Sequence, residues 1–152
     1  MNKQVYKIYL AGPIQFVSQE EAEDWREYAM NIISMMNTTF GEDMFGFFDP
    51  CRGKDLSKKY GIEDAKPLVM RDLADIRASD VVLMNIPSGA RIIGTACELM
   101  YVHMIGVPVV IVCDENDSKH PWIHFLATKT FRTLDEAINW IADEIPHWPE
   151  RR

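Results

Sequence analysis

The chain has 152 residues, 47% hydrophobic and 26% charged, which is typical of a globular protein and long enough to bury a core as one domain, residues 1–152. Its net charge of −7 disfavours duplex nucleic acid and anionic membranes as partners, because both select basic surfaces. No apolar run approaches the roughly 18 residues that span a bilayer, and no signal segment is expected. Three cysteines without Cys-x-x-Cys spacing indicate reduced thiols, so we expect a cytoplasmic protein.

Short apolar runs alternate with helical patterns along the chain. Strands are predicted at residues 5–11, 45–48, 80–86 and 107–113, with a weaker strand near 127–131. Helices are predicted at 20–36, at 67–78 with Pro67 in the first position, at 94–106, and at 134–145 behind a capping box of Thr133 and Glu136. A polar loop is expected between the last two strands. This alternation predicts an α/β fold: a flavodoxin-like, doubly wound parallel sheet of five strands in the order 2-1-3-4-5.

The mouth of such a sheet is the expected ligand site. Ligands bind outside the carboxyl ends of the strands, near the switch point between strands 1 and 3. Gly12 and Pro13 follow the first strand, and residues 85–93 follow the third. Gly94 and Thr95 then open a helix and offer backbone amides there.

Glu98 is the most informative residue in the chain. The helix at 94–106 is apolar almost all the way round, which predicts burial on every side, and only His103 is also ionisable there. Burying a carboxylate without partners costs several kcal/mol, and the positive end of the helix dipole favours its charged form. Such a group suits nucleophilic attack on an electrophilic carbon such as a sugar C1′. The alternative is a glutamate paired with a buried cation or tyrosine, or facing a subunit interface.

Asp72 and Tyr9 are predicted to lie near Glu98. Asp72 projects into the apolar face of the helix at 67–78 and Asp75 lies at its edge, which would place a second acid at the site for paired-carboxylate chemistry. Pairing of Asp72 with Arg71 or Arg77 is the alternative. Tyr9 points along the first strand towards the same mouth, where its hydroxyl would orient Glu98, unless it is a core tyrosine.

Basic residues and histidines elsewhere in the chain give weaker indications of phosphate or metal binding. The loop at 51–66 is locally basic and is either a lid over an anionic substrate or simply solvated. Its basic residues are Arg52, Lys54, Lys58, Lys59 and Lys66. Arg91 is a second candidate for a phosphate. His120 and His124 have no obvious third ligand, and GxGxxG and P-loop motifs are absent, so neither a metal nor an organic cofactor is predicted.

Four ordered motifs resemble the nucleoside 2-deoxyribosyltransferase family over roughly residues 6–113. They are Ile8-Tyr9-Leu10-Ala11-Gly12-Pro13, Asp49-Pro50, the run from Arg71 to Asp80, and Gly94-Thr95-Ala96-Cys97-Glu98-Leu99. The resemblance implies a flavodoxin-like fold and cleavage of the N-glycosidic bond of 2′-deoxynucleosides without a cofactor. Glu98 would attack C1′, Tyr9 would hold Glu98, and Asp72 would bind or protonate the base, with Gly12, Pro13, Asp49, Asp75, Gly94 and Thr95 around the substrate.

The resemblance also bears on substrates and partners. It implies that a free nucleobase accepts the sugar, and that the chain forms a homo-oligomer in which a neighbour completes each pocket. Transferases of this family carry an Asp shortly before the Gly-Thr pair, whereas residues 88–93 contain no acid. Related 2′-deoxynucleoside 5′-monophosphate N-hydrolases lack it too, and Ser88 and Arg91 would bind the phosphate in that case. Because the Gly-Thr-Ala-x-Glu form at residues 94–98 is closer to that of the transferases, we predict a transferase, with such a hydrolase or a non-catalytic nucleotide-sensing domain as alternatives.

Overall fold

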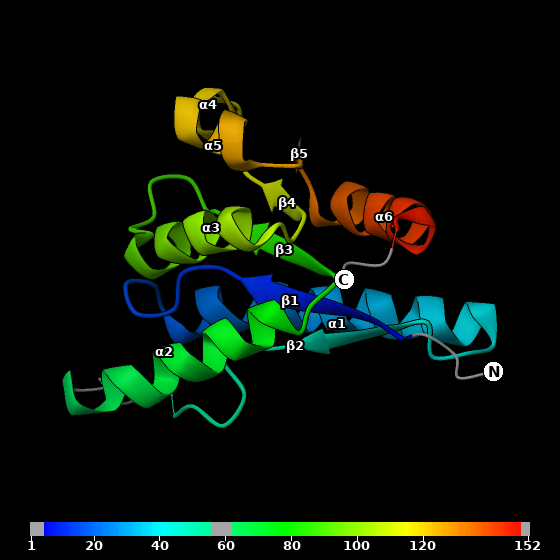
Figure 1. The fold of residues 1–152 in the computed structure, drawn as a ribbon, viewed down its shortest axis with the longest axis horizontal. Coiled ribbons are helices and arrows are strands. Elements are labelled where there is room, and N and C mark those ends of the chain that lie inside the picture. The colour runs from blue at the N-terminus through cyan, green and yellow to red at the C-terminus, as the bar shows by residue number, and fades with distance from the viewer. Residues whose placement is uncertain (1–4, 56–61, 150–152) are drawn as a thin grey trace.

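A computed structural model of the protein describes residues 5–55 and 62–149. Its centre is a parallel five-stranded sheet with the predicted order β2-β1-β3-β4-β5 (Figure 1). The strands are β1 (Tyr6–Ala11), β2 (Phe45–Phe48), β3 (Val81–Asn85), β4 (Val109–Val112) and β5 (Lys129–Phe131). The α/β prediction is confirmed.

Helices cover both faces of the sheet (Figure 1). They are α1 (Gln19–Phe40), α2 (Ile62–Arg77), α3 (Ile93–Ile105), α4 (Glu115–Lys119), α5 (Pro121–Leu126) and α6 (Leu134–Glu144), and a 3-10 turn (Ile145–His147) follows α6. Helices α1 and α6 share one core layer with the sheet, and α2, α3 and α5 share the other. None of the helices in the described ranges is long and apolar enough to cross a membrane.

The period-two geometry of a strand explains the two core layers. In β1, Ile8 and Leu10 point to the layer of α1 and α6, whereas Tyr9 and Ala11 point to the layer of α2 and α3. All four are at most 1% exposed. Burial on both faces is why these strands are continuous apolar runs rather than alternating ones.

Local capping sets the helix ends. The Ser18 hydroxyl accepts from the Glu21 amide at 3.1 Å and the Glu21 carboxylate accepts from the Ser18 amide at 2.8 Å, which starts α1. The helix runs four residues beyond the predicted end and stops at Gly41, whose φ of 68° suits glycine. The Thr133 hydroxyl accepts from the Glu136 amide at 3.3 Å, so α6 begins where the sequence predicted.

Two local predictions were wrong. Pro67 does not take the first position of α2, because the helix begins at Ile62 with Glu63 and Asp64 in a first turn that the helix dipole favours. The proline therefore costs a single backbone hydrogen bond near the helix start. The segment expected to be a loop between β4 and β5 contains α4 and α5, with Asp114 capping α4 and Pro121 at the start of α5.

The prediction that the Glu98 helix is buried on every side was also wrong. Only Thr95, Leu99 and Val102 of α3 are buried in the chain. Glu98 and Tyr101 are partly buried, and the other residues of α3 are exposed, with Met104 71% exposed. The cause is position: α3 belongs to the outer layer on its face of the sheet, and the residues that the structure describes place no further layer over most of it.

Candidate active site

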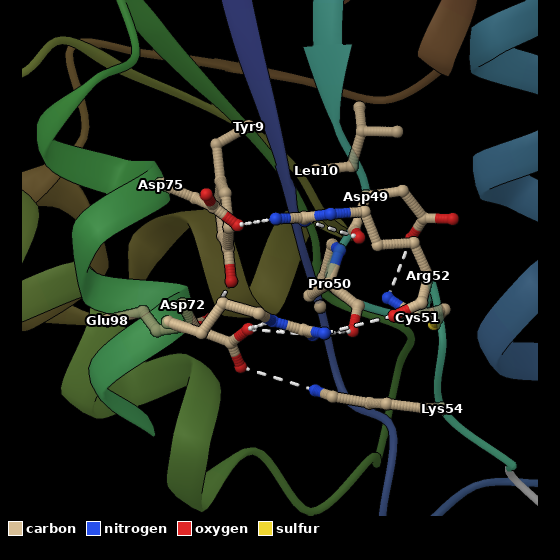
Figure 2. A network of polar contacts seen from close by, with 12 residues as sticks. Tyr9, Leu10, Asp49, Pro50, Cys51, Arg52, Lys54, Asp72, Asp75 and Glu98 are labelled. Carbon is tan, nitrogen blue, oxygen red and sulfur yellow. Dashed lines mark hydrogen bonds and ion pairs between the residues drawn. The ribbon is translucent and has the colours of Figure 1, made fainter. Parts of the chain in front are cut away.

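Tyr9 and Glu98 meet as the sequence predicted. Tyr9 is fully buried in β1, and its hydroxyl donates to Glu98 Oε1 at 2.9 Å (Figure 2). Glu98 is the sixth residue of α3, which follows β3 directly across the switch point between β1 and β3. The contact occupies one oxygen of the carboxyl group.

Burial raises the pKa values of both Tyr9 and Glu98. Loss of solvent raises the pKa of Glu98 to about 7, and the nearby Asp72 carboxylate adds to this, while the Tyr9 hydrogen bond and the charges of Arg26 and Lys54 act in the opposite direction. Burial and the Glu98 charge raise the pKa of Tyr9 far above its ordinary value, so its hydroxyl remains a donor. Near neutral pH the Glu98 carboxyl exchanges between its two protonation states, which suits covalent and acid–base chemistry.

Asp72 lies in the same site and pairs with two cations (Figure 2). Its Oδ2 accepts from Lys54 Nζ at 3.2 Å, and its Oδ1 accepts from Arg71 Nη2 at 3.2 Å. The sequence left pairing with Arg71 open, and that pair is present. Arg77 instead donates to the Tyr101 hydroxyl. Asp72 therefore lies near Glu98 while both of its oxygens already accept hydrogen bonds.

The described part of the basic loop is bonded to α2, although Arg52, Gly53 and Asp55 remain exposed to solvent. Arg71 donates to the carbonyls of Pro50 and Arg52, at 2.7 and 3.0 Å. Arg52 in turn pairs with Asp75 at 2.6 Å (Figure 2). Asp75, predicted to bind substrate, thus anchors the loop. Lys58 and Lys59 of the predicted lid lie outside the described residues, and Lys66 is exposed on α2.

Asp49 is likewise engaged inside the protein. Its Oδ1 accepts from the Cys51 amide at 2.8 Å and lies 3.8 Å from Arg26 Nε. Its backbone carbonyl accepts from the Arg52 side chain at 3.0 Å. The carboxylate predicted to contact substrate therefore shapes the turn after β2.

Arg26 is a site residue that the sequence reasoning missed. It is 1% exposed, and its guanidinium donates to the carbonyls of Leu10 and Gly12, at 3.3 and 3.0 Å, and to that of Ala22. Desolvation lowers its pKa, with Cys51 and Asp49 acting in the opposite direction. Arg26 thereby fixes the end of β1 that presents Tyr9. The available signal was its position on the buried helical stripe that contains Ala22, Ala29 and Ile33.

The small residues at the mouth shape the backbone. A Cβ added to Gly12 would lie 2.9 Å from Trp25 Cζ2 and 3.0 Å from the Asn85 carbonyl, so the ends of β1 and β3 approach too closely for a side chain. Pro13 is buried beside it. At the start of α3, Thr95 is buried, whereas Gly94 is exposed with open space around it.

Ser88 and Arg91 lie in the loop between β3 and α3. The Ser88 side chain bonds the carboxylate of Asp114, whose pKa is lowered mainly by the Asp117 amide and then by this contact. The Arg91 guanidinium lies 4.2 Å from the ring centre of Phe16, joining the loops that follow β1 and β3. An open hollow of about 500 Å³ lies at the ends of β3 and β4, where Asp114 is among the residues that line it. In residues 5–55 and 62–149 no three metal-ligating side chains gather.

Fold and site together define a flavodoxin-like α/β protein whose acidic groups and buried tyrosine meet at the switch point of the sheet. The family model described as nucleoside 2-deoxyribosyltransferase matches residues 8–138. The chain therefore belongs to the nucleoside 2-deoxyribosyltransferase family, as its motifs predicted.

Solved structures share the fold. A 2-deoxyribosyltransferase from Bacillus psychrosaccharolyticus is 21% identical with a TM-score of 0.66, covering 88% of this chain and 90% of its own. A conserved protein from Enterococcus faecalis V583 is 18% identical, with a TM-score of 0.67 and coverages of 95% and 99%. A 2-desoxiribosyltransferase from Leishmania mexicana is 18% identical, with a TM-score of 0.60 and coverages of 91% and 98%. Among curated proteins there is no match.

Proposed function

We propose that the protein cleaves the N-glycosidic bond of 2′-deoxyribonucleosides through Glu98 and transfers the deoxyribosyl group to another nucleobase. The observation that carries this proposal is the Tyr9–Glu98 hydrogen bond of 2.9 Å at the switch point of the sheet. It leaves Glu98 Oε2 as the oxygen that attacks C1′. Family membership supports the substrate class.

The reaction proceeds by two displacements at C1′. Glu98 first forms a covalent deoxyribosyl ester as the base departs, and a second base then attacks the same carbon and releases the carboxylate. A missing 2′-hydroxyl eases both steps, because that electron-withdrawing group would destabilise the oxocarbenium-like transition state. The family resemblance assigns Asp72 to the departing base in this arrangement.

The second candidate is hydrolysis of 2′-deoxynucleoside 5′-monophosphates. It is favoured by the loop at 88–93, which contains Ser88 and Arg91 but no acid. Arg91 offers a guanidinium held over Phe16, a suitable group for a phosphate. Water would then take the place of the accepting base.

One experiment separates these functions. The protein is incubated with a deoxynucleoside and with its 5′-monophosphate, each with and without a different free base, and products are separated by chromatography. A new nucleoside supports transfer, and free base from the monophosphate alone supports hydrolysis. If neither substrate gives a product, both enzymatic functions are refuted and the non-catalytic sensing domain is supported.

We also propose that the chain acts as a homo-oligomer through the outer faces of α3 and α5. These helices are neighbours, since the His103 and Phe125 ring centres lie 5.5 Å apart. Met104 and Phe125 are each 71% exposed and Trp122 is 63% exposed, an apolar surface of the kind that marks interfaces. Met104→Asp should shift the protein to a smaller species in size-exclusion chromatography with light scattering. An unchanged mass, or a monomeric wild type, would refute this interface.

A further inference from the structure

Lys54 is a partly buried cation without a role in the reaction described above. Its Nζ lies 3.2 Å from Asp72 Oδ2, and its side chain is only 9% exposed. Its charge also reaches the nucleophile, since it helps to hold down the pKa of Glu98. Lysine is seldom buried without a partner or a task. Lys54 therefore pairs with Asp72 (Figure 2) and lies near enough to Glu98 for its charge to act on that carboxyl group.

The hydrogen bonds at Asp72 show where the transferable protons are. Its Oδ2 accepts from Lys54 and its Oδ1 accepts from Arg71, the pattern expected of an ionised carboxylate held between two cations. Arg71 also donates to the carbonyls of Pro50 and Arg52, and a guanidinium does not give up its proton.

The Lys54 ammonium differs from that guanidinium. It carries three hydrogens, and within the part of the chain that the structure describes its Nζ bonds to Asp72 alone. A lysine can release a proton and take it back. Among the groups around Asp72, Lys54 is therefore the one equipped to donate a proton.

We propose that Lys54 protonates the departing nucleobase, and that Asp72 holds Lys54 in place. This assignment rests on the proposed cleavage of the glycosidic bond. As Glu98 bonds to C1′, the electron pair of the C1′–N bond moves to the base, and a ring nitrogen takes a proton from Lys54 Nζ. In the second step the accepting base, or water, attacks C1′ and returns a proton to the neutral amine, while Glu98 leaves as a carboxylate.

The test compares substrates that differ in their need for a proton. 2′-Deoxyguanosine releases its base readily only when the base is protonated, whereas N7-methyl-2′-deoxyguanosine already carries that positive charge. Lys54→Met should lose at least about a hundredfold in kcat on the first substrate and less than about tenfold on the second. If the wild type accepts only pyrimidines, 2′-deoxyuridine and its 5-fluoro derivative replace this pair, and the better leaving base should suffer less.

Two further variants control for charge and for loop anchoring. Lys54→Arg keeps the positive charge but not a transferable proton, so it should lose as much as Lys54→Met on 2′-deoxyguanosine. Arg52→Met removes another loop anchor and should affect both substrates equally. Thermal unfolding verifies that each variant is folded.

The outcomes distinguish the two proposals. Equal losses of Lys54→Met on both substrates, or recovery by Lys54→Arg, would overturn the role of Lys54 while leaving the proposed function intact. A wild type that cleaves none of these substrates or their 5′-monophosphates would refute the proposed function itself.

Discussion

Replacing Glu98 by Gln should stabilise the protein at neutral pH while removing its activity. The folded state raises the pKa of Glu98 from an ordinary 4.5 to about 7, mainly by desolvation. Each pKa unit corresponds to about 1.4 kcal/mol, so ionised Glu98 lowers the free energy of unfolding by roughly 3 to 4 kcal/mol at most. The glutamine side chain keeps an oxygen that can accept from Tyr9 but carries no charge.

The raised pKa of Glu98 fixes how the stability difference between the wild type and Glu98→Gln changes with pH. Below pH 4.5 the carboxyl is protonated in both the folded and the unfolded state, and the variant has no advantage. Between pH 4.5 and about 7 the unfolded chain ionises first, so the wild type loses stability relative to Glu98→Gln, and the difference is constant above that range.

Urea denaturation of both proteins at several pH values from 5 to 9 measures this difference. Glu27→Gln is a matched control, because Glu27 is exposed on α1, and it should track the wild type. Parallel curves for the wild type and Glu98→Gln at all pH values would refute the account of Glu98 as a desolvated carboxyl group.

Two other substitutions test the groups that position Glu98. Tyr9→Phe removes the bond to Glu98 and should lower kcat/KM roughly 10- to 100-fold, with the acidic limb of the pH profile moved to higher pH, because that bond lowers the pKa of Glu98. Tyr6→Phe in the same strand, which loses only a bond to a backbone carbonyl, should keep its activity; equal effects of the two would contradict the role of Tyr9. Arg26→Met removes three hydrogen bonds to backbone carbonyls and should cost about 3 kcal/mol in urea unfolding, and a loss below about 1 kcal/mol would show that these bonds contribute little.

The sheet could be predicted because its signals are local. Each strand is a short apolar run between turn residues, and alternation with helices leaves few topologies for a parallel sheet. The same reasoning placed Tyr9 and Glu98 together, because Tyr9 lies near the end of a strand and Glu98 lies in the second turn of a helix that starts at the same edge of the sheet. The start of α2 before Pro67 and the helices α4 and α5 were missed for a common reason. Proline is usually read as a helix end and a run of polar residues as a loop, but neither signal rules out a short helix.

The polar partners could not be read from the sequence. Lys54 meets Asp72 across 18 residues, and Arg26 meets the carbonyls of Leu10 and Gly12 from another element, so no local period reveals these contacts. The exposure of α3 was missed for a different reason. An apolar helix predicts that its faces are covered, but not whether the same chain covers them.

The central claim is that Glu98 forms a covalent bond to the sugar. A deoxynucleoside analogue with fluorine at C2′ and a readily departing base should trap this species, because the electron-withdrawing fluorine slows its breakdown. Peptide mass mapping should then find the sugar on Glu98 in the wild type and no adduct in Glu98→Gln. A sugar bound to another residue, or turnover of a natural substrate by Glu98→Gln at the wild-type rate, would contradict the account.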